Sequence, residues 1–533
     1  MKTLEDSIMV TLLEGPNNNA FDLAVGAART CYAQKTILPE DIRKDEKSTK
    51  LANNIFDGVV EAGHHTTIQH PQFTFVLEGI SRQFTWSFLH SHPFYNSEQQ
   101  SQRYVDIKPE NFVIPRFEKQ ESAELFEKTV KLCAESYFKL QEITEKQILD
   151  EWLKLYPGRR NETDKWKNTW HKRVIESARY VIPVCAQTKM YHTISGLTLF
   201  RYAKMMNQFD TPKENHLAVG KMLELAQKHS PEYFRKLDET APLRHSPELQ
   251  MFETFFGTYG RHAGAAKFVK QFDTELDGLT SKLVDWNHNA QRTLADAYRA
   301  VFGMPRDHRY HGNGSNNVLT DENAIDLLLN PAKNTWLSST LRVNAHSKIG
   351  RVMNQVHYTF KKKISHTADS QDQRHRMTPG ARPILAGHFT EEPDCIWPAS
   401  YAKIPEAMEL VQKTSKQVWD TMNHLYDRGE PWESIQYLLP NATAIRFTES
   451  GDLLNFHHKW TTRLCYLAQE EIWRNCKEEV AQVSQVHPLI GKYLSAPCTL
   501  RKMTGTSPYC PEGNRYCGVP VWTKQVKDYE RVI

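Results

Sequence analysis

The chain has 533 residues, of which 40% are hydrophobic and 24% are charged, and its net charge is only +4. This length exceeds one ordinary hydrophobic core, which predicts about two to four domains. The small net charge argues against a surface that coats nucleic acid, and no stretch approaches the ~20 apolar residues of a membrane helix. We therefore expect neither nucleic acid nor a membrane as a partner.

The first residues of the chain and its cysteines indicate the compartment. Residues 1–10 contain Glu5 and Asp6 and no long apolar run, so a signal peptide is not expected. Nine cysteines are too few for a disulfide scaffold, and most are isolated, as thiols in a reducing compartment are. The sequence predicts a cytoplasmic protein.

Strand and helix patterns alternate through the first part of the chain. Residues 73–79 (FTFVLEG) are aromatic, β-branched and alternating, which predicts a strand, and the aromatic segment after it is typical of a buried helix. Residues 122–156 have apolar positions at helical spacing, which predicts one long helix or a helix pair. Residues 176–195 predict a helix, a turn at Pro183 and a strand.

A second, similar series of segments follows. Residues 356–365 are similar to 71–81, and residues 433–451 are similar to 176–196, in the same order. This order indicates a divergent tandem duplication. We predict an α/β (α+β) fold of two halves, each a mixed β-sheet with long helices, paired as a pseudo-dimer. The predicted boundaries are 1–235 for the first half, 236–330 for a linker and the start of the second half, 331–485 for the second half, and 486–533 for a cysteine-containing tail.

Several short motifs lie in these halves: GHHTTIQHPQFTFVLEGISR from Gly63, SEQQSQRY from Ser97, ARYVIP from Ala178 and RLCYLAQEEI from Arg463. In combination they resemble the flavin-dependent thymidylate synthases, the ThyX family. The resemblance covers roughly residues 20–210 and 330–480, so both halves are ThyX-like. It lies in the Gly-His stretch, the Ser-x-Arg loop, the Ala-Arg-x-x-Leu-Pro element and the helix with the late Arg.

The two halves keep different parts of this motif set. The first half retains Ser101, Arg103 and Arg179, but it has His90, Ser91 and His92 at the Arg-His-Arg position and Met206 at the late Arg position. The second half lacks Ser-x-Arg and has Gln436 at the position of Arg179. Its retained residues are Gln371, Arg374, His375, Arg376 and Arg463.

These losses are complementary. The resemblance implies a nucleotide site between subunits, with one side supplied by the residues that the first half keeps and the other by those that the second half keeps. We therefore expect one composite site per chain and a mirror-image site that has been lost. Whether the two sides meet within one chain or between chains stays open at this point.

The resemblance also implies the chemistry. It implies conversion of dUMP to dTMP with FAD, with methylenetetrahydrofolate as the one-carbon donor and NADPH as the reductant. Arginine suits the nucleotide phosphate and the charge that develops on the pyrimidine, because its guanidinium is always charged and donates parallel hydrogen bonds. No cysteine nucleophile is required.

Site residues follow from the same resemblance. The implied catalytic residues are Arg374, Ser101 and Arg463. The implied substrate-binding residues are Gln99, Ser101, Gln102, Arg103, Arg179, Gln371, Arg374 and Arg463, although the family often has an acid at the position of Gln99. The implied cofactor-binding residues are His64, Thr66, Arg374, His375, Arg376 and His458.

Each feature also has an ordinary structural interpretation. Single arginines are mostly surface residues in ion pairs, Ser101 suits a helix cap, and His90 and His92 are more typical of a degenerate motif than of a metal pair. In the tail, Cys498, Cys510 and Cys517 together with His487 would complete a structural zinc site. The alternative is that these thiols are unliganded.

Two other functions stay open on the sequence. Gln99, and Asp452 with Leu454 in place of the family's Asn-x-Arg, leave room for a related flavin- and folate-dependent enzyme that alkylates another pyrimidine nucleotide. A non-catalytic nucleotide-binding homologue is the second alternative. For assembly, we expect a homodimer in which two chains rebuild the four-subunit arrangement of the family.

Overall fold

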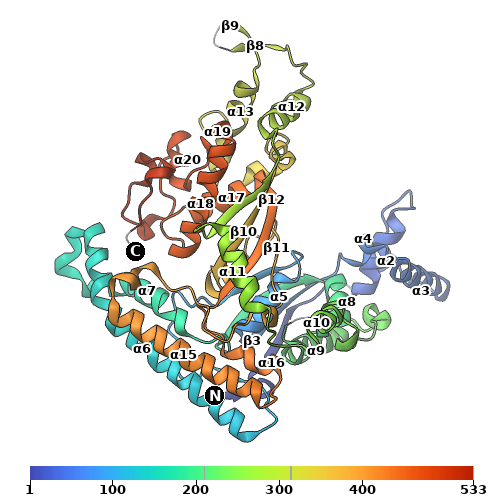
Figure 1. Ribbon diagram of the computed structural model, residues 1–533. Helices are drawn as coiled ribbons and strands as arrows, with labels where there is room; N and C mark the ends of the chain where they lie inside the picture. Colours follow the sequence, from blue (N-terminus) through green and yellow to red (C-terminus); the bar gives the residue numbers. More distant parts are fainter. Residues whose placement is uncertain (18, 209, 313–314, 532) are drawn as a thin grey trace.

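Two four-stranded β-sheets with surrounding helices form the centre of the molecule, and the described residues also contain two two-stranded sheets (Figure 1). A computed structural model describes residues 1–17, 19–208, 210–312, 315–531 and 533, without the side chains of 208, 310–312 and 315–317. Within this described part, no helix is long and apolar enough to cross a membrane.

The two four-stranded sheets have the same strand arrangement. The first has the order β2 (Met9–Glu14), β3 (Gln72–Ser81), β6 (Gln187–Ser195), β4 (Asn96–Gln99). The second has the order β7 (Ser281–Trp286), β10 (His357–Ser365), β12 (Ala444–Asp452), β11 (Gly380–Ala381). In chain order, each sheet begins with one edge strand, which is followed by the first central strand, the other edge strand and then the second central strand.

All pairings in these sheets are antiparallel. The prediction of mixed sheets is therefore wrong in this respect. Each central pair is joined by a long helical segment that leaves and returns at the same end of the sheet, which forces the second strand to run opposite to the first.

The central strands lead directly into helices, and the sequence predicts the first of these. β3 ends at Ser81, whose hydroxyl accepts from the Phe84 amide (2.8 Å) and caps α5 (Arg82–His90). β10 ends at Ser365, which caps α14 (His366–Asp372) in the same way, 3.1 Å from the amide of Ala368. The predicted strands and the buried aromatic helix are confirmed.

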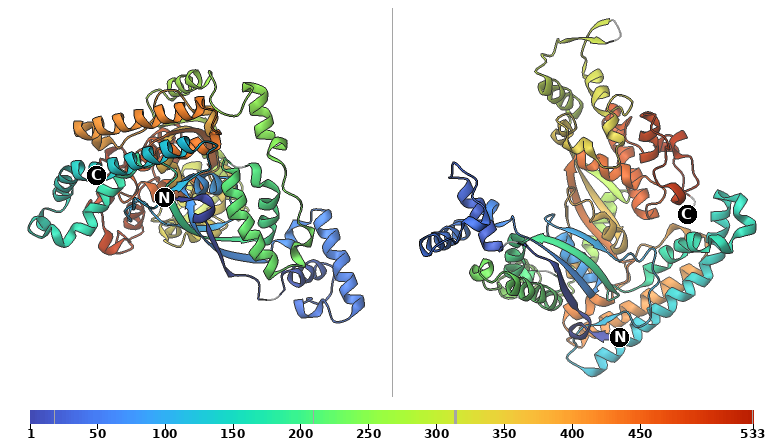
Figure 2. Two further views of the ribbon diagram at one scale, coloured as in Figure 1. Left: turned by 90° about the horizontal axis from the view of Figure 1, so that it is seen from below. Right: turned by 180° about the vertical axis from the view of Figure 1, so that it is seen from behind.

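Corresponding helices follow the later strands. β6 leads into α8 (Gly196–Met205) and α9 (Pro212–His229), and β12 leads into α17 (Leu453–Arg463) and α18 (Glu470–Val486). The segment predicted at 122–156 is one helix, α6 (Gln120–Leu155), and it packs along α15 (Pro405–Asp427) of the second half (Figures 1 and 2). The hydroxyls of Thr129 and Thr421 lie 3.0 Å apart between them.

The two halves join at Pro183 and Pro440, which form an antiparallel bridge. Pro183 follows α7 (Lys167–Ala178), and Pro440 follows α16 (Trp432–Ile435). Beside the bridge, the Val184 amide donates to the Leu439 carbonyl (2.8 Å) and the Asn441 amide donates to the Ile182 carbonyl (2.8 Å). One hydrophobic core extends across this junction, from Phe75 in the first sheet to Trp419 in α15.

The remaining elements lie around these sheets. α11 (Ala265–Leu276) lies against β10, where Asp273 pairs with Lys363 (2.7 Å) and Arg446 (2.8 Å). The other α-helices and strands are β1 (Lys2–Thr3), α1 (Leu4–Ser7), α2 (Ala20–Thr30), α3 (Glu46–Glu61), α4 (His65–Ile68), β5 (Val113–Ile114), α10 (Pro247–Phe256), α12 (Ala290–Phe302), β8 (Arg309–Gly312), β9 (Ser315–Val318), α13 (Asp321–Leu329), α19 (Pro488–Gly491) and α20 (Pro497–Met503).

Candidate functional site

Polar residues from both halves meet beside the proline junction. Arg179 is buried, and its guanidinium donates to Oε1 of Gln469 (2.6 Å). The side-chain amide of Gln371 donates to the same oxygen. Gln469 in turn donates to the hydroxyl of Tyr180 (2.5 Å). The predicted residues Arg179 and Gln371 are thus joined within one chain, through a glutamine of the second half.

The Ser-x-Arg loop of the first half also contacts the second half. The Arg103 guanidinium donates to Glu176 (2.8 Å) and to the backbone carbonyl of Leu467 (2.7 Å). The Arg103 amide donates to the Ser101 hydroxyl (3.2 Å). The side chain of Gln102 accepts from Asn441 (3.1 Å), so the loop is held on both sides of its arginine.

The second-half side of the site is formed by α14 and α17. Arg463 donates to the Gln371 carbonyl (2.8 Å) and to Nε2 of His375 (2.8 Å). Burial and the adjacent Arg463 hold the pKa of His375 well below its usual value, so the imidazole is neutral and able to accept this hydrogen bond. Arg374 pairs with Glu98 of the first half (2.5 Å) and is about half exposed.

The site carries more buried positive charge than its carboxylates neutralise. Burial lowers the pKa of Arg179 and of Arg463 to about 10, and Arg103 and Arg374 add to the effect at Arg463. Although burial opposes it, Arg103 and Arg173 lower the pKa of Glu176 to about 2, so this carboxylate is ionised. Several like charges in a partly desolvated site favour the binding of an anion.

Unsatisfied polar atoms point to the same conclusion. Within the described part of the chain, Nε of Arg179, Nε2 of Gln102 and Oε1 of Gln371 are buried and have no hydrogen-bond partner. Buried polar groups are nearly always paired, and those that are not often mark a place for a ligand. Here the unpaired set includes two donors and one acceptor, which suits a ligand with anionic and amide-like groups.

The mirror-image positions have a different character. His90 corresponds to Arg374, because each lies at the same distance after the capping serine, Ser81 or Ser365. Burial lowers the pKa of His90 to about 4, and its Nε2 lies 3.4 Å from the buried carboxylate of Asp369. Asp369 is also paired with Arg382 (2.7 Å).

The other mirror positions are filled from within the chain. Met206, at the late Arg position, is buried in the core. Gln436, at the position of Arg179, is buried and donates to the backbone carbonyl of Asp210 (2.7 Å). The cationic cluster found on one side of the junction is therefore replaced by neutral groups and an internal ion pair on the other.

The structure places the predicted flavin residues in two separate regions. His375 and His458 lie together, with ring centroids 5.8 Å apart, and Arg376 donates to the Pro93 carbonyl (3.0 Å). His64 and Thr66 are exposed at α4, which contacts α2, α3 and α8 and lies apart from α17 (Figure 1). One chain does not bring these two groups together.

The predicted zinc ligands do not form a metal site. Among the residues that the structure describes, no group of three or more His, Cys, Asp or Glu side chains is arranged to hold a metal ion. His487 is buried in the core of the second half, where its Nδ1 lies 3.0 Å from the hydroxyl of Tyr358. The structure therefore does not bring Cys498, Cys510, Cys517 and His487 together as one ligand set, because His487 is hydrogen-bonded in the sheet core, and zinc binding by the three cysteines stays a prediction.

Two site residues were missed at the level of sequence. Gln469 connects Arg179 to Gln371, and its signal is the Ala-Gln-x-Glu-Ile segment after Arg463. Arg82 donates to Gln99 (3.0 Å), and burial together with Arg179 lowers its pKa to about 9. Arg82 directly follows Ser81 in the predicted strand motif. Gln99 is therefore held by a buried arginine of its own half.

Comparisons with known proteins agree with this arrangement in two halves. The family model of the thymidylate synthase complementing protein matches residues 12–232 and 282–489. A flavin-dependent thymidylate synthase from Clostridium tetani is 28% identical over 230 residues, which cover 43% of this chain and 86% of the relative. One from Geobacter sulfurreducens is 26% identical over 213 residues, covering 39% of this chain and 78% of the relative.

Among solved structures, the UMP/dUMP methylase PolB from Streptomyces cacaoi, bound with 5-Br dUMP, matches 44% of this chain and 97% of its own with 16% identity and a TM-score of 0.32. The two segments matched by the family model together span most of the chain. The chain is therefore a member of the thymidylate synthase complementing protein family, the enzyme family of the flavin-dependent thymidylate synthases, and it contains the family's sequence in two segments.

Proposed function

We propose that this chain methylates carbon 5 of dUMP to give dTMP, at a single composite site formed by its two halves. FAD, methylenetetrahydrofolate and NADPH would serve as cofactor, one-carbon donor and reductant. The observation that carries the proposal is the link from Arg179 through Gln469 to Gln371, because it joins the residues that each half retains.

The phosphate would bind where the unpaired donors are. Nε of Arg179 and Nε2 of Gln102, which have no hydrogen-bond partner among the residues described, belong to the same junction as the Ser101 hydroxyl and Arg103. Guanidinium groups bind phosphate with two parallel hydrogen bonds, and a dianion offsets the cost of burying Arg179 beside Arg103. Binding would therefore relieve the like-charge repulsion within the cluster.

The pyrimidine would lie toward α14 and α17. Arg463 and Arg374 lie on that side, and both would stabilise negative charge on the ring oxygens as carbon 5 becomes nucleophilic. Neutral His375 holds the Arg463 guanidinium in place through its Nε2. Ser101 and Gln371 would supply the remaining polar contacts and orient the ring.

The second-half residues fit part of a flavin. His458 lines a cavity of 140 Å³ with Arg342 and His457, and Nε of Arg342 and Nε2 of His457 are buried there without a hydrogen-bond partner among the described residues. When bound, the flavin would supply the hydride. The cavity is too small for a whole FAD, and His64 and Thr66 are distant, so those two residues would contact the FAD of another chain.

This arrangement leads to a proposal for assembly. The halves form a pseudo-dimer within the chain, and two chains would form a homodimer that supplies the missing flavin contacts. A monomer would then hold the nucleotide site, whereas tight flavin binding would need the dimer. Light scattering of the purified protein with and without FAD measures this directly.

The proposed function has a direct test. Purified protein reconstituted with FAD should show a flavin absorption band that dUMP perturbs, and it should form dTMP when methylenetetrahydrofolate and NADPH are supplied. Product formation is measured by chromatography of the nucleotides. A protein that binds neither FAD nor dUMP, or that binds both and transfers no carbon, contradicts the proposal.

A further inference from the structure

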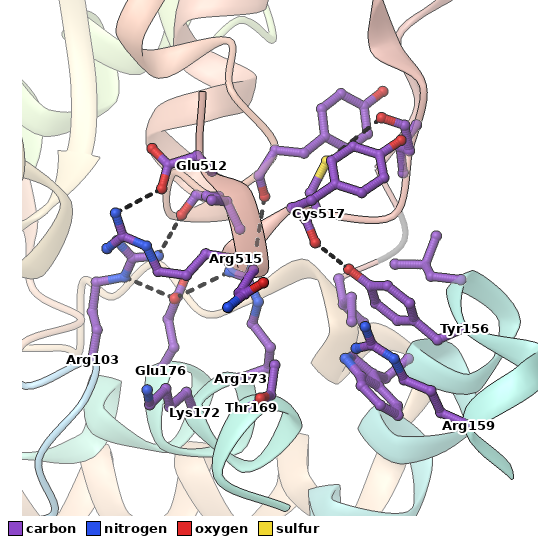
Figure 3. Close-up of a pocket in the computed structure, with 18 of the residues that line it drawn as sticks. Arg103, Tyr156, Arg159, Thr169, Lys172, Arg173, Glu176, Glu512, Arg515 and Cys517 are labelled. Carbon is purple, nitrogen blue, oxygen red and sulfur yellow. Dashed lines mark hydrogen bonds and ion pairs between the residues drawn. The ribbon is translucent and has the colours of Figure 1, made fainter. Parts of the chain in front are cut away.

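A cavity of 390 Å³ lies beside the composite site, between the first half and the C-terminal segment (Figure 3). Its volume falls in the range of small-molecule pockets. Arg103 lines it, and so do residues from the end of α6, from α7 and from the segment 512–533. Residues 490–533 lie outside the segments matched by the family model, so part of this wall is an addition of this chain.

The cationic residues of the cavity fall into two groups. Arg103 and Arg173 share the carboxylate of Glu176, at 2.8 and 3.4 Å, and Arg515 pairs with Glu512 at 2.8 Å. In the part of the chain that the structure describes, Arg159 and Lys172 have no carboxylate within ion-pair distance. Two cations are thus available to an anionic ligand.

Aromatic rings stand next to both of these cations. The Arg159 guanidinium lies 3.7 Å from the ring centroid of Trp166 and 4.2 Å from that of Tyr156. The Lys172 ammonium lies 5.4 Å from the ring of Tyr104, which is 52% exposed. Figure 3 shows Arg103, Glu176 and Arg515 on one side of the cavity and Tyr156 with Arg159 on the other.

From this combination we infer that the cavity is a second ligand site, for a nucleoside triphosphate whose phosphate chain is attracted by Lys172 and Arg159, which lie on opposite sides in Figure 3, and whose base stacks on one of the aromatic rings beside them. Aromatic side chains stack with any base, and lysine and arginine both bind phosphate. The site is distinct from the composite site, where Arg179, Gln371 and Arg463 meet.

Arg103 connects the two sites. Its guanidinium lines the cavity and contacts Glu176 and Leu467, while its amide donates to Ser101 of the composite site. A phosphate in the cavity that attracts Arg103 would move it from Glu176 and change the position of the Ser101 loop. Occupancy of the cavity would therefore change the affinity of the composite site for its substrate, and by linkage the reverse.

The inference is tested by counting nucleotide sites on the full chain. Thymidine triphosphate is titrated by calorimetry into the FAD-loaded protein, with and without saturating dUMP. With dUMP present, we expect one remaining site for the triphosphate. The double variant Arg159→Gln/Lys172→Gln should bind it at least about tenfold more weakly, since each charged hydrogen bond contributes that order of affinity.

Lys167→Gln is the matched control, because Lys167 is an exposed lysine on the same helix that does not line the cavity. It should bind like the unaltered protein, and both variants should keep the same unfolding midpoint. Arg374→Ala should lose dUMP and keep the triphosphate. The inference is overturned if the double variant binds the triphosphate normally, or if pyrophosphate binds as well as the triphosphate, which removes the role of the base.

Failure of the proposed function gives a different result. If dUMP does not bind or react and the triphosphate still responds to Arg159→Gln/Lys172→Gln, the cavity site stands and the methylation proposal falls. If dUMP is turned over and no second site responds to these substitutions, the reverse holds.

Discussion

Tyr180 of the first half donates a hydrogen bond to the buried carboxylate of Glu471 in the second half (2.7 Å), and Tyr437 of the second half donates to Glu214 in the first (2.5 Å). Each carboxylate also accepts from a capping serine, Ser365 or Ser81. The two contacts therefore occupy corresponding positions in the two halves. They fix both strand-to-helix turns to the opposite half. Among the described residues, the contact at Tyr180, unlike the one at Tyr437, is also linked to the cationic cluster through Gln469.

The first prediction uses these two tyrosines as a matched pair. Tyr180→Phe and Tyr437→Phe should each lower the free energy of unfolding by about 1–3 kcal/mol, the cost of an unpaired buried polar group. Only Tyr180→Phe should also weaken dUMP binding, because it releases Gln469. Denaturant unfolding and calorimetry measure the two effects. Equal loss of binding in both variants would show that the mirror side also binds nucleotide.

The second prediction concerns the arginines of the composite site. Arg103→Ala and Arg374→Ala should each weaken dUMP binding by about 2–5 kcal/mol, the range for truncating one member of a charged contact. Ser91→Ala, on the mirror side, should leave turnover nearly unchanged, since its hydroxyl only caps a helix end at the Phe88 carbonyl. Full activity in both arginine variants would refute the composite site.

The third prediction asks whether the site lies within one chain. Arg179 and Arg103 contact Gln469 and Leu467 of the same chain, so mixing Arg103→Ala chains with Arg374→Ala chains should restore no activity. If the site formed between chains, mixed dimers would contain one intact site. Recovery of a substantial part of the activity on mixing would contradict the contacts described here.

The fourth prediction is a pH dependence of stability. Burial raises the pKa of Glu214 from 4.5 to about 7, so between these values the folded protein holds a proton that the unfolded chain has lost. The free energy of unfolding should therefore fall as the pH rises from 4.5 to 7, by up to about 1.4 kcal/mol for each pKa unit. Compared with Glu214→Gln, which cannot titrate, the unaltered protein should show this extra slope. Parallel pH profiles of the two proteins would contradict the assignment.

The fifth prediction concerns a buried charge network under the site helices. The Lys459 ammonium contacts Asp372 on α14 (2.7 Å) and Glu449 on β12 (2.5 Å), and all three are buried. Lys459→Met removes one of the two buried lysines that pair with these carboxylates, the other being Lys362 at 3.0 Å from each, and the negative charge left in excess should cost about 3–5 kcal/mol. Lys416→Met removes a half-exposed lysine from its ion pairs and should change stability by at most about 1 kcal/mol. Similar unfolding midpoints for the two variants would show that the network contributes little.

Much of the fold could be predicted from short segments of sequence. Alternation at 73–79 and helical spacing at 122–156 predict β3 and α6, because burial of one face imposes those periods locally. The same patterns at 356–365 and 433–451 predict the second half. Which motifs each half retains is also a property of the sequence, and it predicts one composite site.

Tertiary structure alone decided how those pieces meet. Whether Arg179 and Gln371 meet in one site within the chain depends on the antiparallel bridge between Pro183 and Pro440. No local sequence pattern specifies a pairing between residues so far apart in the chain. The same holds for Gln469, which becomes a site residue only through its two partners, and for His487, which burial places beside Tyr358 rather than beside the cysteines. The periodicity of a helix or strand depends on residues that are neighbours in the sequence. A site depends on contacts between residues that are distant in the sequence, and those contacts follow from the packing of the whole core.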